Sequence, residues 1–286
     1  QWYQPCFDVQ TTCLIDQLLV ISMTPLARLR RVLRVWKGEC LQDPVFFLHI
    51  PKCGGSSVTQ ALEESLGLRK WLTGKYHYLK AAPSRKAADD MGLSLMDYRN
   101  HILSYHMNDE TMMYVGGHFG FSRRLYDQHS DRWTYITILR DPVKKWFSQY
   151  FYNRYKEDNH FSIEGGIEAF AHSETGRHLG SDFVHKLTDG IPADECDSDA
   201  AIQQARANVD RFDVVGVIEE VDAFIADCRD LFGFELNIPH VNKSPVEVQR
   251  RETMITDEIR ARVESYCEPD RRVYNYVLDQ CVQGHR

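Results

Sequence analysis

The chain has 286 residues, of which 43% are hydrophobic and 26% are charged, and this composition is that of a globular protein with a full core. A formal net charge of −7 argues against a general nucleic-acid binder, because no basic excess is available to offset phosphates. The eight cysteines include neither a C-x-x-C motif nor a Cys/His cluster with zinc spacing, so we expect no structural metal. Their even number permits disulfides, but buried free thiols are expected in a chain of this size.

The first 40 residues are expected to be an extension ahead of one domain that spans residues 41–286. Residues 14–21 are the main apolar stretch near the start, and they are too short and too polar to cross a bilayer. In residues 26–37, arginines and a lysine are interleaved with Leu, Val and Trp, which predicts an amphipathic cationic helix. This helix could contact an anionic membrane surface, grip an acidic glycan, or only pack its apolar stripe on the domain.

Residues 45–50 are an apolar run between two prolines and predict a buried strand of a parallel sheet. Ser56 and Ser57 follow and are expected to open an amphipathic helix, which Gly67 ends. The sequence therefore predicts a strand, a loop and a helix start in immediate succession.

The loop between this strand and this helix has the features of an anion site. Gly54 and Gly55 let backbone N–H groups turn towards a ligand, and the helix N-terminus and Lys52 add positive charge. The loop differs from the nucleoside-triphosphate P-loop, in which the lysine follows the last glycine. A plain strand-to-helix turn that happens to contain a lysine is the alternative.

A histidine follows the next predicted strand. Residues 68–108 are polar and without clear periodicity, as is common in variable surface that grips an acceptor. Residues 111–117 predict a second strand, and His118 lies just past its carboxyl end, on the side where open α/β sheets bind ligands. A histidine that only caps a turn is the alternative.

Residues 133–139 predict a third strand that runs into the sequence RDPVKKWFSQY. Asp141 suits the N-cap position and Pro142 the first helical turn, so we expect a helix to about residue 155. Ser148 lies nearly two turns into this helix, where it could face the same phosphate as Arg140. An R-D-P sequence is also common at ordinary strand-to-helix junctions.

The rest of the chain is mostly helical in pattern. We predict a fourth strand at residues 212–217 and helices at residues 163–172, 174–187, 200–209, 221–232 and 257–281. The polar segment HVNKS at residues 240–244 could close over a bound nucleotide or be a surface loop.

Two of these motifs resemble those of the sulfotransferases that use 3′-phosphoadenosine 5′-phosphosulfate (PAPS). PKCGGSS at residues 51–57 is similar to the family's 5′-phosphosulfate loop, and LRDPVKKWFSQY at residues 139–150 is similar to its 3′-phosphate motif. Lys145 stands where the family usually has arginine, which keeps the charge but loses the bidentate geometry and leaves its role open. The pair Gly117-His118 resembles a G-H pair that lies between the two motifs in this family. Residues 240–244 look like a segment of its carbohydrate branch, the Golgi and bacterial enzymes that resemble heparan-sulfate O-sulfotransferases.

The resemblance implies an α/β, P-loop-like, three-layer fold with a central, largely parallel sheet flanked by helices. It implies transfer of a sulfuryl group from PAPS to a hydroxyl of a carbohydrate or glycolipid, with 3′,5′-adenosine bisphosphate (PAP) as product and no metal. His118 would be the general base, an imidazole titrating near neutrality, and Lys52 would stabilise the leaving oxygen. The next candidates for the base are His49, His77, His101 and His106. The residues implied to bind the nucleotide are Lys52, Cys53, Gly54, Gly55, Ser56, Ser57, Arg140 and Ser148.

Two other classes of protein stay open. A kinase or nucleotide hydrolase of P-loop-like fold would need a Walker lysine and a Mg²⁺-binding carboxylate, and neither stands in the expected sequence order. A non-catalytic module that binds glycans or nucleotides would keep the loop without needing His118. The expected location is the cytoplasm or a membrane surface if the chain is bacterial, and the Golgi lumen if it is a trimmed eukaryotic enzyme; the cytoplasm is preferred.

Overall fold

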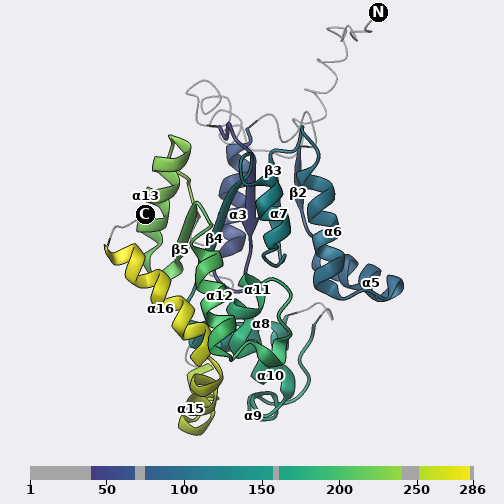
Figure 1. Cartoon of the computed structure of the whole chain (residues 1–286). Helices are drawn as coiled ribbons and strands as arrows, with labels where there is room; N and C mark the ends of the chain where they lie inside the picture. The colour runs from purple at the N-terminus through teal and green to yellow at the C-terminus, as the bar shows by residue number, and fades with distance from the viewer. Residues whose placement is uncertain (1–39, 68–74, 157–160, 240–250, 284–286) are drawn as a thin grey trace, which may run out of the picture.

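Five parallel strands form one sheet, in the order β2-β3-β1-β4-β5. This computed structural model describes residues 40–67, 75–156, 161–239 and 251–283, and helices flank the sheet on both sides (Figure 1). The predicted α/β fold with a central parallel sheet is therefore confirmed. The strands are β1 (Val45–Leu48), β2 (Tyr76–Tyr78), β3 (Tyr114–Gly117), β4 (Thr134–Leu139) and β5 (Val214–Val217).

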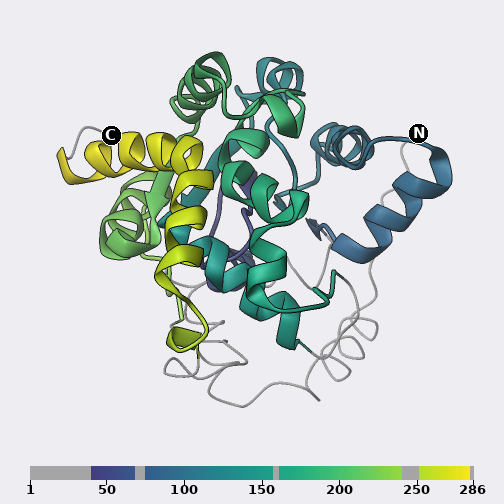
Figure 2. The ribbon, with the colours of Figure 1, turned by 90° about the horizontal axis from the view of Figure 1, so that it is seen from below.

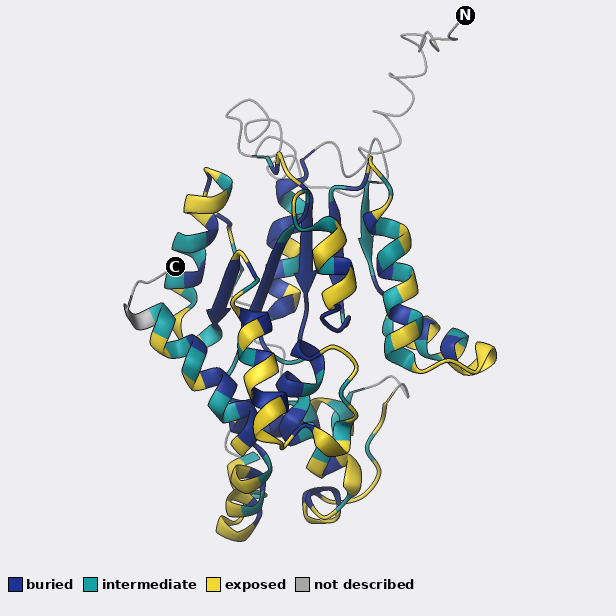
Figure 3. Ribbon diagram, in the orientation of Figure 1, coloured by how far each residue is buried: buried dark blue, intermediate teal, exposed yellow. Residues whose placement is uncertain are grey.

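Two helical layers cover the sheet because successive side chains of each strand point to opposite faces. Val45 and Phe47 of β1 pack on one face, where α3 (Gly55–Ser65) and α13 (Val221–Phe232) cover them. Phe46 packs on the other face. That face contacts α6 (Leu95–Met107), α7 (Arg123–His129), α11 (Asp182–Leu187), α12 (Asp199–Val209) and α16 (Glu268–Gln283). Burial on both faces (Figure 3) explains why β1, β4 and β5 are nearly continuous apolar runs.

A third group of helices packs together at the end of the sheet towards which the strands point (Figure 1; seen from below in Figure 2). Its core contains Trp146, Tyr150 and Phe170. The group consists of α8 (Pro142–Tyr155), α9 (Ile167–Ala171), α10 (Glu174–His178) and α15 (Asp257–Tyr266). Helix α5 (Ala81–Met91) packs against α6 beside the sheet.

Several elements have the predicted bounds because local signals define them. Helix α8 runs from Pro142 to Tyr155, and the Asp141 carboxylate accepts a hydrogen bond from the Lys144 N–H at 2.8 Å as its cap. Helix α13 matches the prediction at both ends, and β1, β3, β4 and β5 lie within the predicted strands. One cap differs from the prediction: α3 begins at Gly55, after Gly54 in a left-handed conformation, and Ser56 is not its cap.

Other elements differ from the sequence prediction. The sequence assigned no element within residues 68–108, whereas the described residues 75–108 hold β2, α5 and α6. The helix predicted at residues 174–187 divides into α10, the 3-10 turn Leu179–Ser181 and α11, and a side chain at position 180 in this turn would collide with the Tyr266 backbone. The helix predicted at residues 163–172 is shorter and corresponds to α9. The helix predicted at residues 257–281 divides into α15 and α16.

Two sequence predictions fall on residues 26–37 and 240–244, which lie outside the described residues. Among the helices that are described, none combines the length and apolar character needed to cross a membrane. The side chains of Cys53, Cys196, Cys228 and Cys267 are buried free thiols.

The packing of α3 on the sheet leads to a stability prediction. Leu62 of α3 is fully buried, so Leu62→Ala should lower the free energy of unfolding by about 2–5 kcal/mol, the usual cost of a core cavity. Gln60→Ala on the exposed face of the same helix should change it by less than about 0.5 kcal/mol. Urea denaturation of the three proteins measures both effects, and equal stability of parent and Leu62→Ala would contradict the assigned face.

Candidate functional site

A pocket of about 2280 Å³ opens at the carboxyl edge of the sheet. The residues after β1, β3 and β4 line it on one side, and α8 and α11 line it on the other. This edge is where ligands bind in open α/β sheets, at the point where strand order reverses beside the first strand. The volume exceeds the roughly 300–1,000 Å³ of an ordinary small-molecule site, so two large substrates could be held together.

The loop after β1 forms one wall of this pocket. Lys52 and Gly54 have left-handed backbone conformations, with φ of 65° and 77°. The ring of His49 packs directly against Gly55, and any side chain at position 55 would collide with it. Close packing of the His49 ring against Gly55 therefore helps to shape the loop. Its residues that line the pocket are Pro51, Lys52, Gly54, Gly55, Ser56 and Ser57.

Cys53 differs from the other predicted nucleotide-binding residues. Its side chain is fully buried, its thiol donates to the Pro51 carbonyl at 3.6 Å, and burial raises the pKa of the thiol. It is not among the residues that line the pocket. The Cys53 side chain therefore faces the core, and only its backbone could reach a ligand.

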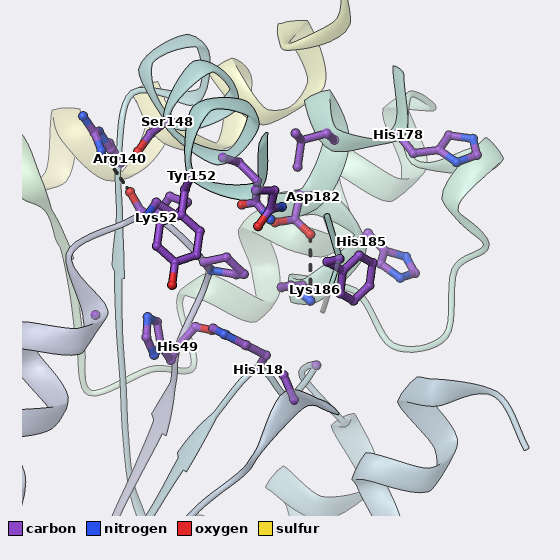
Figure 4. Close-up of a pocket in the computed structure, with 18 of the residues that line it drawn as sticks. His49, Lys52, His118, Arg140, Ser148, Tyr152, His178, Asp182, His185 and Lys186 are labelled. Carbon is purple, nitrogen blue, oxygen red and sulfur yellow. Dashed lines mark hydrogen bonds and ion pairs between the residues drawn. The ribbon is translucent and has the colours of Figure 1, made fainter. Parts of the chain in front are cut away.

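The second predicted phosphate motif meets the first one in this pocket. Arg140 Nη1 donates to the Lys52 carbonyl at 3.1 Å, a bond that is drawn in Figure 4. Ser148 lines the same pocket from α8. The two sequence motifs therefore form one site.

A tyrosine that the sequence reading missed completes this wall. The Lys52 ammonium lies 3.7 Å from the centroid of the Tyr152 ring, a cation–π contact. Burial, and then the charge of Arg140, lower the pKa of Lys52 to about 8. Because Tyr152 is one turn beyond Ser148 on α8, helical spacing alone could have placed it on the same face.

His118 lies where the sequence predicted, directly after β3 and in the wall of the pocket. Its Nδ1 is 2.6 Å from the His49 carbonyl, which can only accept, so Nδ1 carries the proton and Nε2 is the acceptor. Burial lowers the pKa of His118 to about 4. The pKa therefore lies below the near-neutral titration expected from the sequence, because desolvation disfavours the imidazolium.

Of the other candidate bases, only His49 shares the pocket with His118 within the described part of the chain. The two rings are 4.7 Å apart, and His49 Nδ1 lies 2.5 Å from the Tyr78 hydroxyl. Burial, and then the charge of His118, lower the pKa of His49. The remaining candidates, His77, His101 and His106, do not line the pocket.

Lys145 faces the interior and not the ligand side. Its side chain is 1% exposed, and its ammonium lies 2.8 Å from an Asp182 oxygen. Asp270 lies close by and accepts hydrogen bonds from the Phe183 and Val184 N–H groups at the start of α11. Burial raises the pKa of Asp270 to about 8. The structure therefore assigns Lys145 to a buried ionic cluster that joins α8 to α11.

Two further cations of the wall, Arg99 and Lys186, were also missed from the sequence. They belong to α6 and α11, far apart along the chain, and no sequence motif marks either position.

No protein-family model matches the chain, and no curated protein matches it. The function of the pocket is therefore inferred from its own side chains and motifs.

The burial of His118 generates a pH prediction. Because its pKa falls from 6.5 in the unfolded chain to about 4 in the folded one, the unfolded chain binds the proton first as pH falls. The free energy of unfolding should therefore decline from about pH 6.5 to about pH 4, and His118→Gln should remove part of that decline. Urea denaturation at stepped pH measures it. Equal slopes for parent and variant would show that the imidazole titrates normally.

Proposed function

We propose that the chain is a sulfotransferase that moves the sulfuryl group of PAPS to a hydroxyl of a carbohydrate or glycolipid. The observation that carries this proposal is the meeting of two sequence-distant phosphate motifs in one pocket, through the bond from Arg140 to the Lys52 carbonyl. His118 lines the same pocket with Nε2 available as a proton acceptor. The resemblance of both motifs to those of PAPS-dependent enzymes supports the choice of donor.

The two motifs would divide the nucleotide between them. The N–H groups of Gly54 and Gly55 and the hydroxyls of Ser56 and Ser57 would hold the 5′-phosphate at the start of α3, where the helix dipole favours an anion. Arg140 and Ser148 would hold the 3′-phosphate, which AMP and ATP lack. The left-handed Lys52 would place its ammonium between these groups and the sulfuryl group.

The reaction would be an in-line displacement at sulfur. The acceptor oxygen would form a bond to sulfur while the bond from sulfur to the 5′-phosphate oxygen breaks, and PAP would leave with that electron pair. His118 Nε2 would take the acceptor's hydroxyl proton, and Lys52 would stabilise the charge on the leaving oxygen. Positive charge would come from side chains, so the proposal includes no metal.

The volume of the pocket supports a large acceptor beside the nucleotide. We also propose a cytoplasmic location, which suits the buried thiols of Cys53, Cys196 and Cys228.

The donor assignment makes a binding prediction. The protein should bind PAP roughly ten- to hundred-fold more tightly than AMP, because Arg140 and Ser148 make charge-assisted contacts with the extra phosphate alone. Arg140→Met should remove most of this difference, whereas Arg124→Met, an exposed charge outside the pocket, should keep it. Calorimetry measures both affinities. Equal affinity of the parent for the two nucleotides would remove the basis of the donor assignment.

The enzymatic part depends most on His118. His118→Ala should lower kcat by about 10²–10⁴-fold, the usual effect of losing a positioned base, while PAP affinity hardly changes. His101→Ala, which alters a ring outside the pocket, should keep the parent rate. The assay follows transfer of radiolabelled sulfate from PAPS to a panel of sugars. Transfer by His118→Ala at the parent rate would mean that another group, His49 first, accepts the proton.

A further inference from the structure

A group of three cations lines the pocket in addition to the lysine of the loop after β1 (residues 51–57) and Arg140. Arg85 comes from α5, Arg99 from α6 and Lys186 from α11, and all three line the pocket that contains His118. Arg99 is 4% exposed and Lys186 is 8% exposed, so both charges are almost wholly removed from bulk water. In Figure 4, Lys186 lies on the same pocket as His118 and Lys52.

The two buried cations are poorly neutralised. Arg99 donates only to neutral acceptors, the Ser84 hydroxyl at 3.1–3.2 Å and the His118 carbonyl at 2.5 Å, and no carboxylate of the described residues pairs with it. Lys186 is 3.8 Å from Asp182, whose other oxygen holds Lys145 at 2.8 Å. Asp182 is therefore shared between two lysines, of which Lys145 also has Asp270 nearby, and Arg99 pairs with no carboxylate of the described residues.

The cations also repel one another. Burial, and then the charge of Arg85, lower the pKa of Arg99 to about 10. Burial lowers the pKa of Lys186 as well. The carboxylate of Asp182 raises this pKa, whereas the neighbouring charges of Arg99 and Lys145 lower it. The Nε atom of Arg85 is buried without a hydrogen-bond partner in the described structure. A group of buried like charges is costly unless an anion completes it.

We propose that Arg99 and Lys186 form a second oxyanion subsite beside His118, separate from the loop that holds the phosphates. The subsite takes a sulfate, carboxylate or phosphate group. On the proposed function, that group is either the sulfuryl group of the donor or an acidic group of the acceptor near the reacting hydroxyl. The direct contact of Arg99 with the His118 backbone couples an anion at this subsite to the position of the base.

Inorganic sulfate is the probe for the test, titrated by calorimetry into the protein saturated with PAP, so that the phosphate loop is filled. The parent should bind one sulfate, and Lys186→Met should bind it at least roughly tenfold more weakly, because a charge-assisted hydrogen bond is lost. Asp182 keeps Lys145 as a partner in this variant, so the ionic cluster under the pocket is retained. Arg124→Met is the control, because it removes an equal charge outside the pocket.

Arg99→Lys is the second variant and keeps the charge while losing the fork geometry, so it should also weaken sulfate binding. Unchanged sulfate affinity in both variants, or no binding to the parent, would overturn the subsite. The same sulfate titration without nucleotide separates the subsite from the donor assignment. If PAP fails to bind, the donor assignment fails. The subsite would still be supported if Lys186→Met, titrated without nucleotide, bound one sulfate fewer than the parent.

The source of the anion is decided by two comparisons. If the donor's sulfuryl group occupies the subsite, Lys186→Met should weaken PAPS binding but not PAP binding. If the acceptor supplies the anion, the ratio of PAPS to PAP affinity should stay as in the parent. In that case the parent's PAP complex should bind glucuronate in preference to glucose, and Lys186→Met should lose this preference.

Discussion

The common direction of the strands is the constraint from which the site follows. In the parallel register Leu48 of β1 pairs with Gly117 of β3 and with Thr137 of β4, so the three strands end at one edge. The His49 N–H donates to the Gly117 carbonyl and the Thr137 hydroxyl to the Leu48 carbonyl, which extends the alignment past the strands. Lys52, His118 and Arg140 each lie within a few residues of such an end. Their meeting therefore needs no feature beyond the sheet and the loops that leave it.

The buried ionic cluster holds the opposite wall of the pocket against this edge. Lys145 belongs to α8, Asp182 to α11 and Asp270 to α16, so the cluster fixes three helices relative to one another. Buried ion pairs contribute little net stability, but removal of one partner leaves an uncompensated charge at a cost of several kcal/mol. The main role of the cluster is therefore to position α11, and with it Lys186.

The sequence predicted the parts of the fold that local signals define. An apolar run, a pair of glycines, or Asp141 followed by Pro142 acts over a few residues, and β1, α8 and α13 lie where such signals stand. Contacts between distant segments decided the rest. The three residues of β2 form a strand because β3 pairs with them, and Gly180, where the predicted helix divides, leaves no room for a side chain beside the Tyr266 backbone. The same limit applies to the site: the motifs at residues 51–57 and 139–150 were visible in the sequence, whereas Arg99 and Lys186 share a wall only after α6 and α11 have packed.

The charges of the pocket also bear on the strength of the proposed base. Desolvation is the largest cause of the low pKa of His118, and the charges of Lys186 and Arg99 lower it further. A base with a pKa of about 4 is poorly matched to catalysis at neutral pH, since general base catalysis is most efficient when the pKa of the base is close to the working pH. On the proposed function the nucleotide brings negative phosphates into the same pocket, and an anion beside Arg99 and Lys186 would add another. Each of these charges favours the imidazolium and raises the pKa of His118. The bound nucleotide would thus make His118 a stronger base before it accepts the proton of the acceptor hydroxyl.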